Sequence, residues 1–331
     1  FFKQKTAYEM LRSLVGSEMC IRDRLGFQFK ERAVMERCPP ICDYEGSTYR
    51  TDFWRDREYE DLAERIALRR LLPAEGDLLL EIGAGFGRLA DLYNGYKKVV
   101  LLDYAKSMLR QAQERLGSHE RYIYVAANLY NLPFVDHLFN TAVTVRVLHH
   151  VQDIPTAFGE IQRVLTPSGH YILEYANKRH LKAILRYILR RQQWNPFAPE
   201  PVEFVRLHYD FHPAWIEARL QETGLAIEGQ LAVSHFRHPF IKSLVPPGLL
   251  AAVDGWLQWT ASWWKLSPSI LVRARAEKEH PPAETRGFFR CPACHNPCLV
   301  ETDQALTCPE CQRKWPIDDG IYNFKGDQDL W

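Results

Sequence analysis

The spacing of hydrophobic positions between residues 59 and 177 predicts strands and helices that alternate along the chain. Short apolar runs, typical of buried strands, are separated by longer segments whose apolar residues recur at helical spacing. Such repeated units are typical of a parallel sheet with helices on both faces. We expect strands at 78–82, 98–103, 122–126, 142–148 and 170–175, a turn at 166–169, and helices at 59–72, 107–116 and 155–165, with another helix beginning at 88–93.

After residue 177 the simple alternation ends. We expect a basic helix at 178–191, a Pro-rich connector with Pro196, Pro199 and Pro201, a helix at 213–224, strands at 225–233 and 270–276, and an apolar, Trp-rich segment at 247–264. The charged, Pro-containing stretch 277–287 is typical of a linker. The predicted organisation is an N-terminal helical lead-in at 25–75, an α/β domain at 76–276 with a substrate cap at 178–265, the linker, and a small module at 288–331.

A glycine-rich turn follows the first predicted strand. The sequence Leu-Leu-Glu-Ile-Gly-Ala-Gly-Phe-Gly-Arg occupies 79–88, with glycines at every second position. Glycine lets the backbone turn sharply and lets a ligand approach the main chain. Asp103 ends the next apolar run, and a carboxylate at that place suits the hydroxyl groups of a ribose. The pattern predicts a nucleoside-binding site.

Two classes of cofactor compete for this turn. Dinucleotide-binding enzymes use G-x-G-x-x-G, whereas Gly83, Gly85 and Gly87 form G-x-G-x-G. Over about residues 76–177 the chain resembles class I S-adenosylmethionine-dependent methyltransferases, with a methyltransferase type 11-like domain. The matching segments are 81–87, Asp103, 127–134, 139–143 and 165–169. Asn128, Asn140 and Ser168 stand where Asp, Asp and Gly are more usual in that family.

The resemblance implies a Rossmann-like, seven-stranded sheet, S-adenosyl-L-methionine as cofactor, and transfer of its methyl group by direct displacement. The protein then has to align the acceptor with the methyl carbon and the sulfur. The residues expected to bind the cofactor are Glu81, Gly83, Ala84, Gly85, Gly87, Asp103, Tyr104, Asn128 and Leu129.

A general base is needed if the acceptor atom carries a proton. Ligands lie beyond the carboxyl ends of parallel strands, and Arg146, His149 and His150 follow the fourth predicted strand. We therefore take these three as candidate catalytic residues, with one of the histidines as base. The alternative is that each histidine only caps or packs against the next helix.

Two pairs of cysteines predict a metal site. Cys291 and Cys294 form one C-x2-C turn, Cys308 and Cys311 a second, and thirteen residues separate them. Two such turns supply four thiolates to a structural Zn²⁺ ion. Cys298 is then a spare. The lone pair Cys38 and Cys42, with no second pair nearby, is interpreted as ordinary thiols.

The sequence around these pairs, about residues 288–325, resembles small zinc-ribbon proteins related to activator subunits of RNA and protein methyltransferases. So short a module cannot bury a sufficient core alone, so bound metal is expected to supply folding energy. The ribbon either only stabilises the enzyme or recruits its substrate.

Composition narrows the choice of partners. Forty-two basic and 41 acidic residues give a net charge of +1, which makes no global case for nucleic-acid binding, although a local patch remains open. No apolar run reaches the ~18 residues of a transmembrane helix. Clustered cysteines favour a metal site in a reducing cytoplasm over a disulfide framework. Residues 1–24 resemble translated sequencing-adapter contamination, and we exclude them from fold prediction.

The cap offers basic and Trp-rich segments but does not name the methyl acceptor. We favour a small or lipid-like metabolite as acceptor. The cap residues fit a hydrophobic lid with a solvated charged face, and they would also suit peripheral contact with a membrane. The same residue types stack on bases and contact phosphates, so an RNA- or protein-modifying enzyme recruited through the ribbon is the first alternative. A non-catalytic scaffold that keeps the methyltransferase fold is the second.

Overall fold

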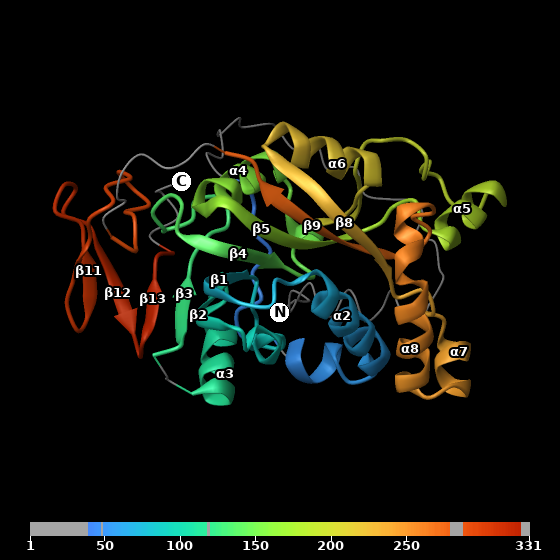
Figure 1. Cartoon of the computed structure of the whole chain (residues 1–331), viewed down its shortest axis with the longest axis horizontal. Coiled ribbons are helices and arrows are strands. Elements are labelled where there is room, and N and C mark those ends of the chain that lie inside the picture. The colour runs from blue at the N-terminus through green and yellow to red at the C-terminus, as the bar shows by residue number, and fades with distance from the viewer. Residues whose placement is uncertain (1–38, 48, 118–119, 279–286, 326–331) are drawn as a thin grey trace, which may run out of the picture.

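A central sheet runs through the computed structural model, which describes residues 39–47, 49–117, 120–278 and 287–325. The strand order is β10-β11-β12-β13-β3-β2-β1-β4-β5-β9-β8, and Figure 1 shows the sheet crossing the whole molecule. The interpretation of residues 1–24 and the assignment of Cys38 fall outside the described residues. Within them, no helix is long and apolar enough to cross a membrane.

Seven of these strands form the predicted Rossmann-like sheet. They are β1 (Gly76–Ile82), β2 (Tyr96–Asp103), β3 (Tyr122–Ala126), β4 (Phe139–Thr144), β5 (Leu165–Ala176), β8 (Leu225–Val233) and β9 (Ser269–Ala276). Strands β1 to β5 pair in parallel, and β9 runs antiparallel to both β5 and β8. From β1 the chain adds β2 and β3 on one side of the sheet and then β4 and β5 on the other side. An open α/β sheet binds ligands at the point where the strand order reverses in this way. The predicted fold class is confirmed, although the continuous sheet has four further strands.

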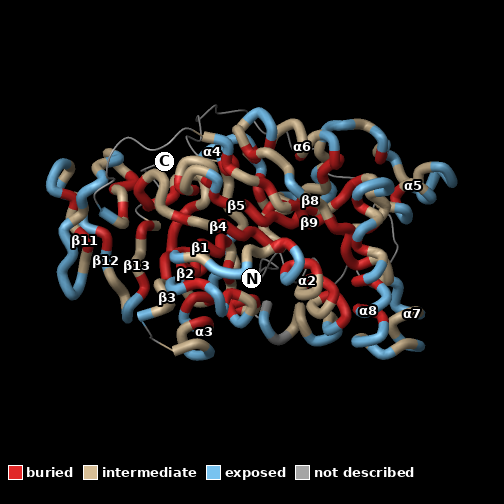
Figure 2. The backbone as a smooth tube through the Cα atoms, viewed as in Figure 1, coloured by how far each residue is buried: buried red, intermediate tan, exposed pale blue. Residues whose placement is uncertain are grey.

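Helices cover both faces of the sheet, as the alternating pattern predicted. One apolar core joins the sheet to α2 (Glu58–Leu71), α3 (Lys106–Leu116) and α8 (Pro247–Leu257), and the other joins it to α4 (Ile154–Val164) and α6 (Pro213–Glu222). Figure 2 shows the strands buried between these layers. The remaining helices are α5 (Leu181–Ile188), α7 (Pro239–Leu244), the π-helix η1 (Tyr49–Phe53) and the 3₁₀ segments η2 (Ala90–Tyr93), η3 (Leu148–His150) and η4 (Gln258–Ser262).

Three local predictions were wrong, and one hairpin was not predicted. The fourth strand stops at Thr144, because Arg146 has φ +60° and leaves the extended conformation. The expected turn at 166–169 is part of β5, with Ser168 at φ +61°. The helix expected from 88–93 is only the 3₁₀ segment η2. The Pro-rich connector is followed by an unpredicted hairpin, β6 (Val202–Val205) and β7 (His208–Asp210).

The four C-terminal strands extend the sheet. They are β10 (Val300–Glu301), β11 (Ala305–Thr307), β12 (Lys314–Asp318) and β13 (Ile321–Asn323). Strand β13 pairs in parallel with β3, so it covers a sheet edge that would otherwise expose unpaired backbone groups. Phe289 stacks on Phe134 with ring centroids 5.8 Å apart, and Phe324 lies 5.1 Å from Phe289. The ribbon therefore shares one apolar core with the α/β domain.

Candidate cofactor and acceptor site

A cavity of about 350 Å³ lies at the carboxyl ends of the parallel strands. Its volume is within the range of small-molecule sites. Six of the nine residues expected to bind cofactor line it: Gly83, Gly85, Asp103, Tyr104, Asn128 and Leu129. All three candidate catalytic residues, Arg146, His149 and His150, line it as well. We call the walls around the six expected cofactor residues the cofactor half of the cavity, and the walls around the three candidate catalytic residues the acceptor half.

The glycine turn forms part of the cofactor half. Gly83 has φ +71°, and a Cβ there would lie 2.2 Å from Val147 Cγ2, so a larger residue would collide with the loop after β4. Gly85 has φ +55°, and no atom lies within 4 Å of its Cβ position. That open space belongs to the cavity, and a ligand can therefore approach the main chain at Gly85.

Gly87 serves packing instead. Its φ is +71°, and a Cβ there would lie 2.8 Å from Leu116 Cδ1 on α3. It does not line the cavity. Its expected contact with cofactor stays a prediction, and its visible role is to let α3 pack closely against the turn.

Asp103 lies at the end of β2, where strand order places a ligand. Its Oδ2 accepts the Gly85 N–H at 2.8 Å, and its Oδ1 accepts the Ala105 N–H at 2.8 Å. Burial raises the pKa of Asp103 to about 6, and these two N–H bonds oppose the shift. The carboxylate is thus mostly ionised at neutral pH, and each oxygen keeps acceptor capacity for a hydroxyl group.

The loop after β3 forms the next wall and is held by the ribbon. Asn128 Oδ1 accepts the Tyr130 N–H at 2.9 Å. Asn131 Nδ2 donates to the Pro292 carbonyl at 2.9 Å, and the Arg290 N–H donates to the Pro133 carbonyl at 3.0 Å. The conformation of this loop therefore depends on the C-terminal module.

Glu81 and Ala84 lie behind the turn rather than in the main cavity. With Arg88 they line a second cavity of about 30 Å³. Burial raises the pKa of Glu81 to about 8, against the lowering effect of the Arg88 charge. Glu81 is therefore mostly protonated at neutral pH. Its expected contact with the cofactor stays a prediction.

The acceptor half contains three histidines in mutual contact. The rings of His149 and His150 lie 3.9 Å apart, and that of His208 lies 4.6 Å from His150. His150 Nδ1 lies 3.0 Å from the Leu207 carbonyl, which can only accept, so Nδ1 carries the proton. Nε2 then accepts the Tyr44 hydroxyl at 2.8 Å. Burial lowers the pKa of His150 to about 4 and that of His149 well below its usual value, so both rings are neutral at pH 7.

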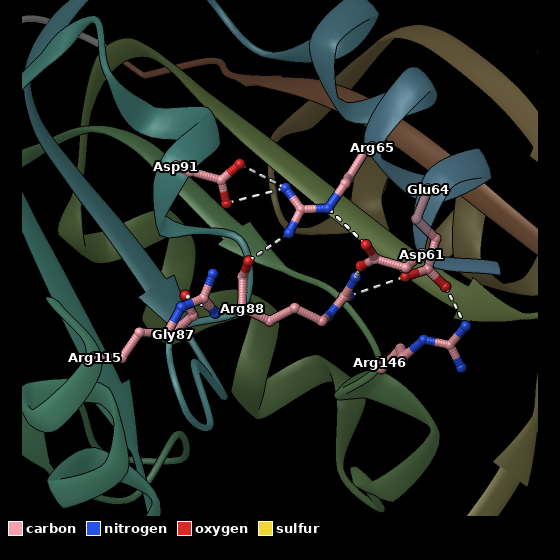
Figure 3. Close-up of polar contacts among 8 residues, drawn as sticks. All are labelled: Asp61, Glu64, Arg65, Gly87, Arg88, Asp91, Arg115 and Arg146. Atoms are coloured by element: carbon pink, nitrogen blue, oxygen red, sulfur yellow. Dashed lines mark hydrogen bonds and ion pairs between the residues drawn. The ribbon is translucent and has the colours of Figure 1, made fainter. Parts of the chain in front are cut away.

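Arg146 faces both the cavity and a charged network. Its backbone N–H donates to Glu174 Oε2 at 3.0 Å, and its guanidinium pairs with the buried Glu64 on α2. Figure 3 shows the network that continues from Glu64. Its other members are Asp61, Arg65, Arg88 and Asp91. The guanidinium is thereby directed toward α2, and any catalytic role of Arg146 stays a prediction.

Sequence reasoning missed three charged residues of the acceptor half. Glu174, Asp210 and Arg237 line the cavity. Burial raises the pKa of Asp210 to about 6, against the lowering effect of Arg237. Glu174 lies near the carboxyl end of β5, so the strand-end rule could have found it. Asp210 belongs to the unpredicted hairpin, and Arg237 follows β8, where no pattern in the sequence pointed to the site.

The described lead-in covers one side of the cavity. Pro40, Ile41, Cys42 and Tyr44 line it. The Gly46 N–H donates to Ser107 Oγ at 2.9 Å, which fixes this segment to α3. Burial raises the pKa of the Cys42 thiol, and its interpretation as an ordinary cysteine stays a prediction.

The four predicted metal ligands converge in the ribbon. The sulfur atoms of Cys291, Cys294, Cys308 and Cys311 lie within 4.8 Å of one another, and two of the S···S distances are 3.6 and 3.4 Å. Tetrahedral zinc with Zn–S bonds of about 2.3 Å separates sulfurs by about 3.8 Å. The donor set therefore fits Zn²⁺. Cys298 is exposed and outside the group.

Comparison with known families matches both parts of the chain. Residues 80–173 match the family described as "Methyltransferase domain", and residues 288–320 match "Trm112p-like protein". The chain is therefore similar to methyltransferase domains over residues 80–173 and to Trm112p-like proteins over residues 288–320, in the two regions where the motifs indicated such a resemblance.

Individual relatives match over shorter stretches. A 2-phytyl-1,4-naphtoquinone methyltransferase of a Nostoc species is 28% identical over 147 residues, covering 42% of this chain and 62% of its own. A malonyl-[acyl-carrier protein] O-methyltransferase of Halorhodospira halophila is 35% identical over 117 residues, covering 34% and 39%. The chain thus spans less than two thirds of these relatives. In a solved complex between the Haloferax volcanii Trm112 methyltransferase activator and a methyltransferase, one chain is 15% identical, with TM-score 0.49 and coverage of 70% of this chain and 95% of that one.

Proposed function

We propose that this chain, with its methyltransferase domain and Trm112p-like domain, is an S-adenosylmethionine-dependent methyltransferase. The observation that carries the proposal is the cavity beside β1, β2 and β4. Its cofactor half brings together the glycine turn, Asp103 and the loop of Asn128. A match to the methyltransferase family alone would not establish that these residues surround a cavity that can hold a ligand.

The residues fit the cofactor. Gly85 presents main chain to the open space, where the methionine portion would lie. Asp103 would accept the ribose hydroxyls, since both of its oxygens retain lone pairs beside their backbone donors. Asn128 and Leu129 would border the adenine. The bound cofactor supplies a methyl group activated by a sulfonium leaving group.

The protein's contribution to the reaction is alignment and proton removal. The walls of the acceptor half would hold the acceptor atom in line with the methyl carbon. We assign Asp210 as the first candidate for general base, because a pKa of about 6 leaves it ionised yet basic near neutral pH. The neutral His149 and His150 are the alternatives, although the low pKa of His150 makes it a weaker base. Tyr44 and the Leu207 carbonyl fix the ring of His150 in place.

The acceptor is a small or lipid-like molecule. The acceptor half has apolar walls that include Phe53, Val147, Val151 and Phe204. Such walls favour an acceptor with an apolar body. The Nostoc relative is described as acting on a naphthoquinone with a phytyl chain, which is consistent with this class.

The ribbon supports a second candidate. Zinc held by the four clustered cysteines would stabilise the Trm112p-like domain. Because residues 288–320 match the family described as "Trm112p-like protein", recruitment of RNA or protein through the ribbon is the alternative. A scaffold without activity is the third reading.

Incubation of the purified chain with methyl-labelled cofactor and fractionated cell extract tests the choice. We expect label in a small-molecule or lipid fraction. Label in RNA or protein would favour the alternative, and salt-sensitive RNA binding would strengthen it. A protein that binds no cofactor would leave only the scaffold.

A further inference from the structure

Exposed apolar side chains gather in one part of the chain. Among the described residues, fourteen of the fifteen large hydrophobic side chains with high exposure lie between residues 181 and 264, and Val300 is the exception. Single exposed apolar residues are normal, but a contiguous patch marks an interaction site. This accumulation of exposed apolar side chains therefore indicates a surface that binds a partner.

Eleven of these residues lie on the outer helices of the cap or directly after η4. Four are tryptophans, with exposed fractions of 80% for Trp256, 60% for Trp259, 82% for Trp263 and 69% for Trp264. The others in the helices are Leu181, Leu185 and Ile188 on α5, Phe240 and Leu244 on α7, and Leu249 and Val253 on α8. We call these eleven residues the cap surface.

The elements that carry the cap surface lie at one end of the molecule. Figure 1 shows α5, α7 and α8 at the end opposite β11 and β12 of the ribbon. The Leu181 N–H donates to the Leu266 carbonyl at 2.9 Å, which joins the start of α5 to the segment after η4. The start of α5 therefore lies beside the segment that directly follows Trp263 and Trp264, although the two elements are far apart in sequence.

Together, the two stretches of sequence that carry the cap surface contain exposed basic residues and no exposed acidic ones. No acidic residue occurs from 178 to 199, whereas Lys182, Arg186, Arg190 and Arg191 are all exposed there. From residue 236 to 268 the only acidic residue is Asp254, which is buried and accepts a hydrogen bond from Tyr59 at 2.6 Å. Within these two stretches the apolar side chains are thus accompanied by exposed basic groups and by no exposed carboxylate; outside them, the exposed Asp56 lies beside α7, where its carbonyl accepts a hydrogen bond from Lys242 Nζ at 2.7 Å.

We propose that the cap surface docks on a membrane that contains anionic phospholipids. Tryptophan is favoured at the boundary between headgroups and acyl chains, since its ring is both apolar and polar. A basic amphipathic helix such as α5 lies in the same boundary with its apolar side inward. Basic groups beside that side attract anionic headgroups.

Two other partners fit less well. A second copy of this chain would bring the basic residues of α5 against their like, without acidic groups to pair with them. Single-stranded RNA would use the tryptophans and arginines, but Leu181, Leu185 and Ile188 offer no aromatic face to a base. A membrane uses both the aliphatic and the aromatic residues.

One exposed apolar residue of the cap that is not part of the cap surface lines the cavity. This residue is Phe204, which is 51% exposed. A membrane-resident acceptor could therefore meet the acceptor half from this side, a consequence that rests on the proposed function. Docking itself does not rest on it, because it needs neither cofactor nor turnover.

Co-sedimentation with vesicles tests the proposal on the full chain without cofactor. Vesicles of phosphatidylcholine with about 30% phosphatidylglycerol should bind the protein, weaken in high salt, and shift its Trp fluorescence to shorter wavelength. Trp263→Ser with Trp264→Ser should reduce binding roughly 10-fold, and Lys182→Gln with Arg191→Gln should reduce it by a similar factor. Lys98→Gln with Lys314→Gln, two exposed residues away from the cap, makes the same charge change and should bind as the wild type.

Circular dichroism and thermal melting would show that each variant keeps its fold, which the exposure of the changed residues favours. Absence of vesicle binding by the folded wild type overturns the proposal. Equal binding by the wild type and the Trp variant overturns it as well. Self-association or RNA binding that is lost in the Trp variant, without vesicle binding, would assign the cap surface to that partner instead.

Discussion

The two halves of the cavity are built from different kinds of backbone. The cofactor half comes from the ends of β1 and β2, the glycine turn and the loop after β3. The ribbon contacts this loop through the hydrogen bond between Asn131 and Pro292. The acceptor half comes mostly from irregular or inserted segments, namely the loop after β4, the hairpin of β6 and β7, the segment after β8 and the lead-in around Tyr44, with Glu174 at the end of β5. Strand ends fix the first half through the sheet, whereas insertions and side-chain contacts fix the second.

Because the two halves are built differently, we expect cofactor affinity and turnover to respond to different substitutions. Changes in the cofactor half should alter affinity for cofactor or the stability of the sheet. Changes in the acceptor half should alter turnover or choice of acceptor while cofactor still binds. The following predictions test that separation, beginning with the largest effect.

Loss of the proposed zinc site in the ribbon should damage the cofactor half most. Cys291→Ser with Cys308→Ser removes two thiolates from a module that shares its core with the sheet. We expect the free energy of unfolding to fall by about 5 kcal/mol or more, since structural zinc contributes more than that in isolated zinc fingers. Denaturant unfolding with measured zinc content checks this, and Cys298→Ser is the control because Cys298 is outside the cluster. An unchanged unfolding curve would show that the ribbon does not support the sheet.

Asp103→Ala should weaken cofactor binding by several hundred-fold. The substitution would remove two charge-assisted hydrogen bonds to the ribose, each contributing about 1.5–3 kcal/mol, and the support of the Gly85 N–H. Calorimetric titration measures the dissociation constant. Asp77→Ala changes an exposed acid at the other end of β1 and should have no effect. Wild-type affinity in the Asp103 variant would remove the acid from the cofactor site.

Asp210→Asn should lower turnover about 100-fold, the usual scale of general-base catalysis, with unchanged cofactor affinity. In the wild type, turnover should rise with pH through about 6 as Asp210 loses its proton. Methyl transfer to the extract fraction that accepts label measures both effects. Glu200→Gln, an exposed acid on the same segment, serves as control. A normal rate in the Asn variant would return the role of base to the histidines.

Glu81→Gln should change the dependence of stability on pH. Because Glu81 has a folded pKa of about 8 against about 4.5 unfolded, the folded state holds an extra proton between these values. Stability of the wild type is therefore lost as pH rises through this window. Between pH 5.5 and 7 the Gln variant should gain about 2 kcal/mol relative to wild type. Chemical unfolding at pH 5.5 and pH 7 measures this difference, and Glu75→Gln, which changes an exposed acid, is the control. Parallel dependence of stability on pH in the wild type and the Glu81 variant would contradict a buried, protonated Glu81.

The same contrast explains what the sequence could predict. Gly83, Gly85 and Asp103 follow directly from the rule that ligands lie at strand ends, because apolar runs reveal the strands. Val145 and Val147 continue the apolar run of β4, but the left-handed φ of Arg146 ends the strand earlier, a feature that no periodicity reveals. The ribbon's cysteines were predictable from their spacing.

The acceptor half was harder for a physical reason. Asp210 lies on a hairpin of short strands after three prolines, where no alternation of hydrophobic residues marks a strand. Tyr44 reaches His150 from a segment more than one hundred residues earlier, and such a contact depends on tertiary folding. The pairing of β13 with β3 likewise depends on two short segments meeting across the chain.

Calorimetric titration of the purified chain with S-adenosylmethionine, and separately with NAD, tests the central claim most directly. The account predicts saturable binding of S-adenosylmethionine at one site per chain and none of NAD. Binding of NAD in its place, or of neither compound, by folded protein would contradict it.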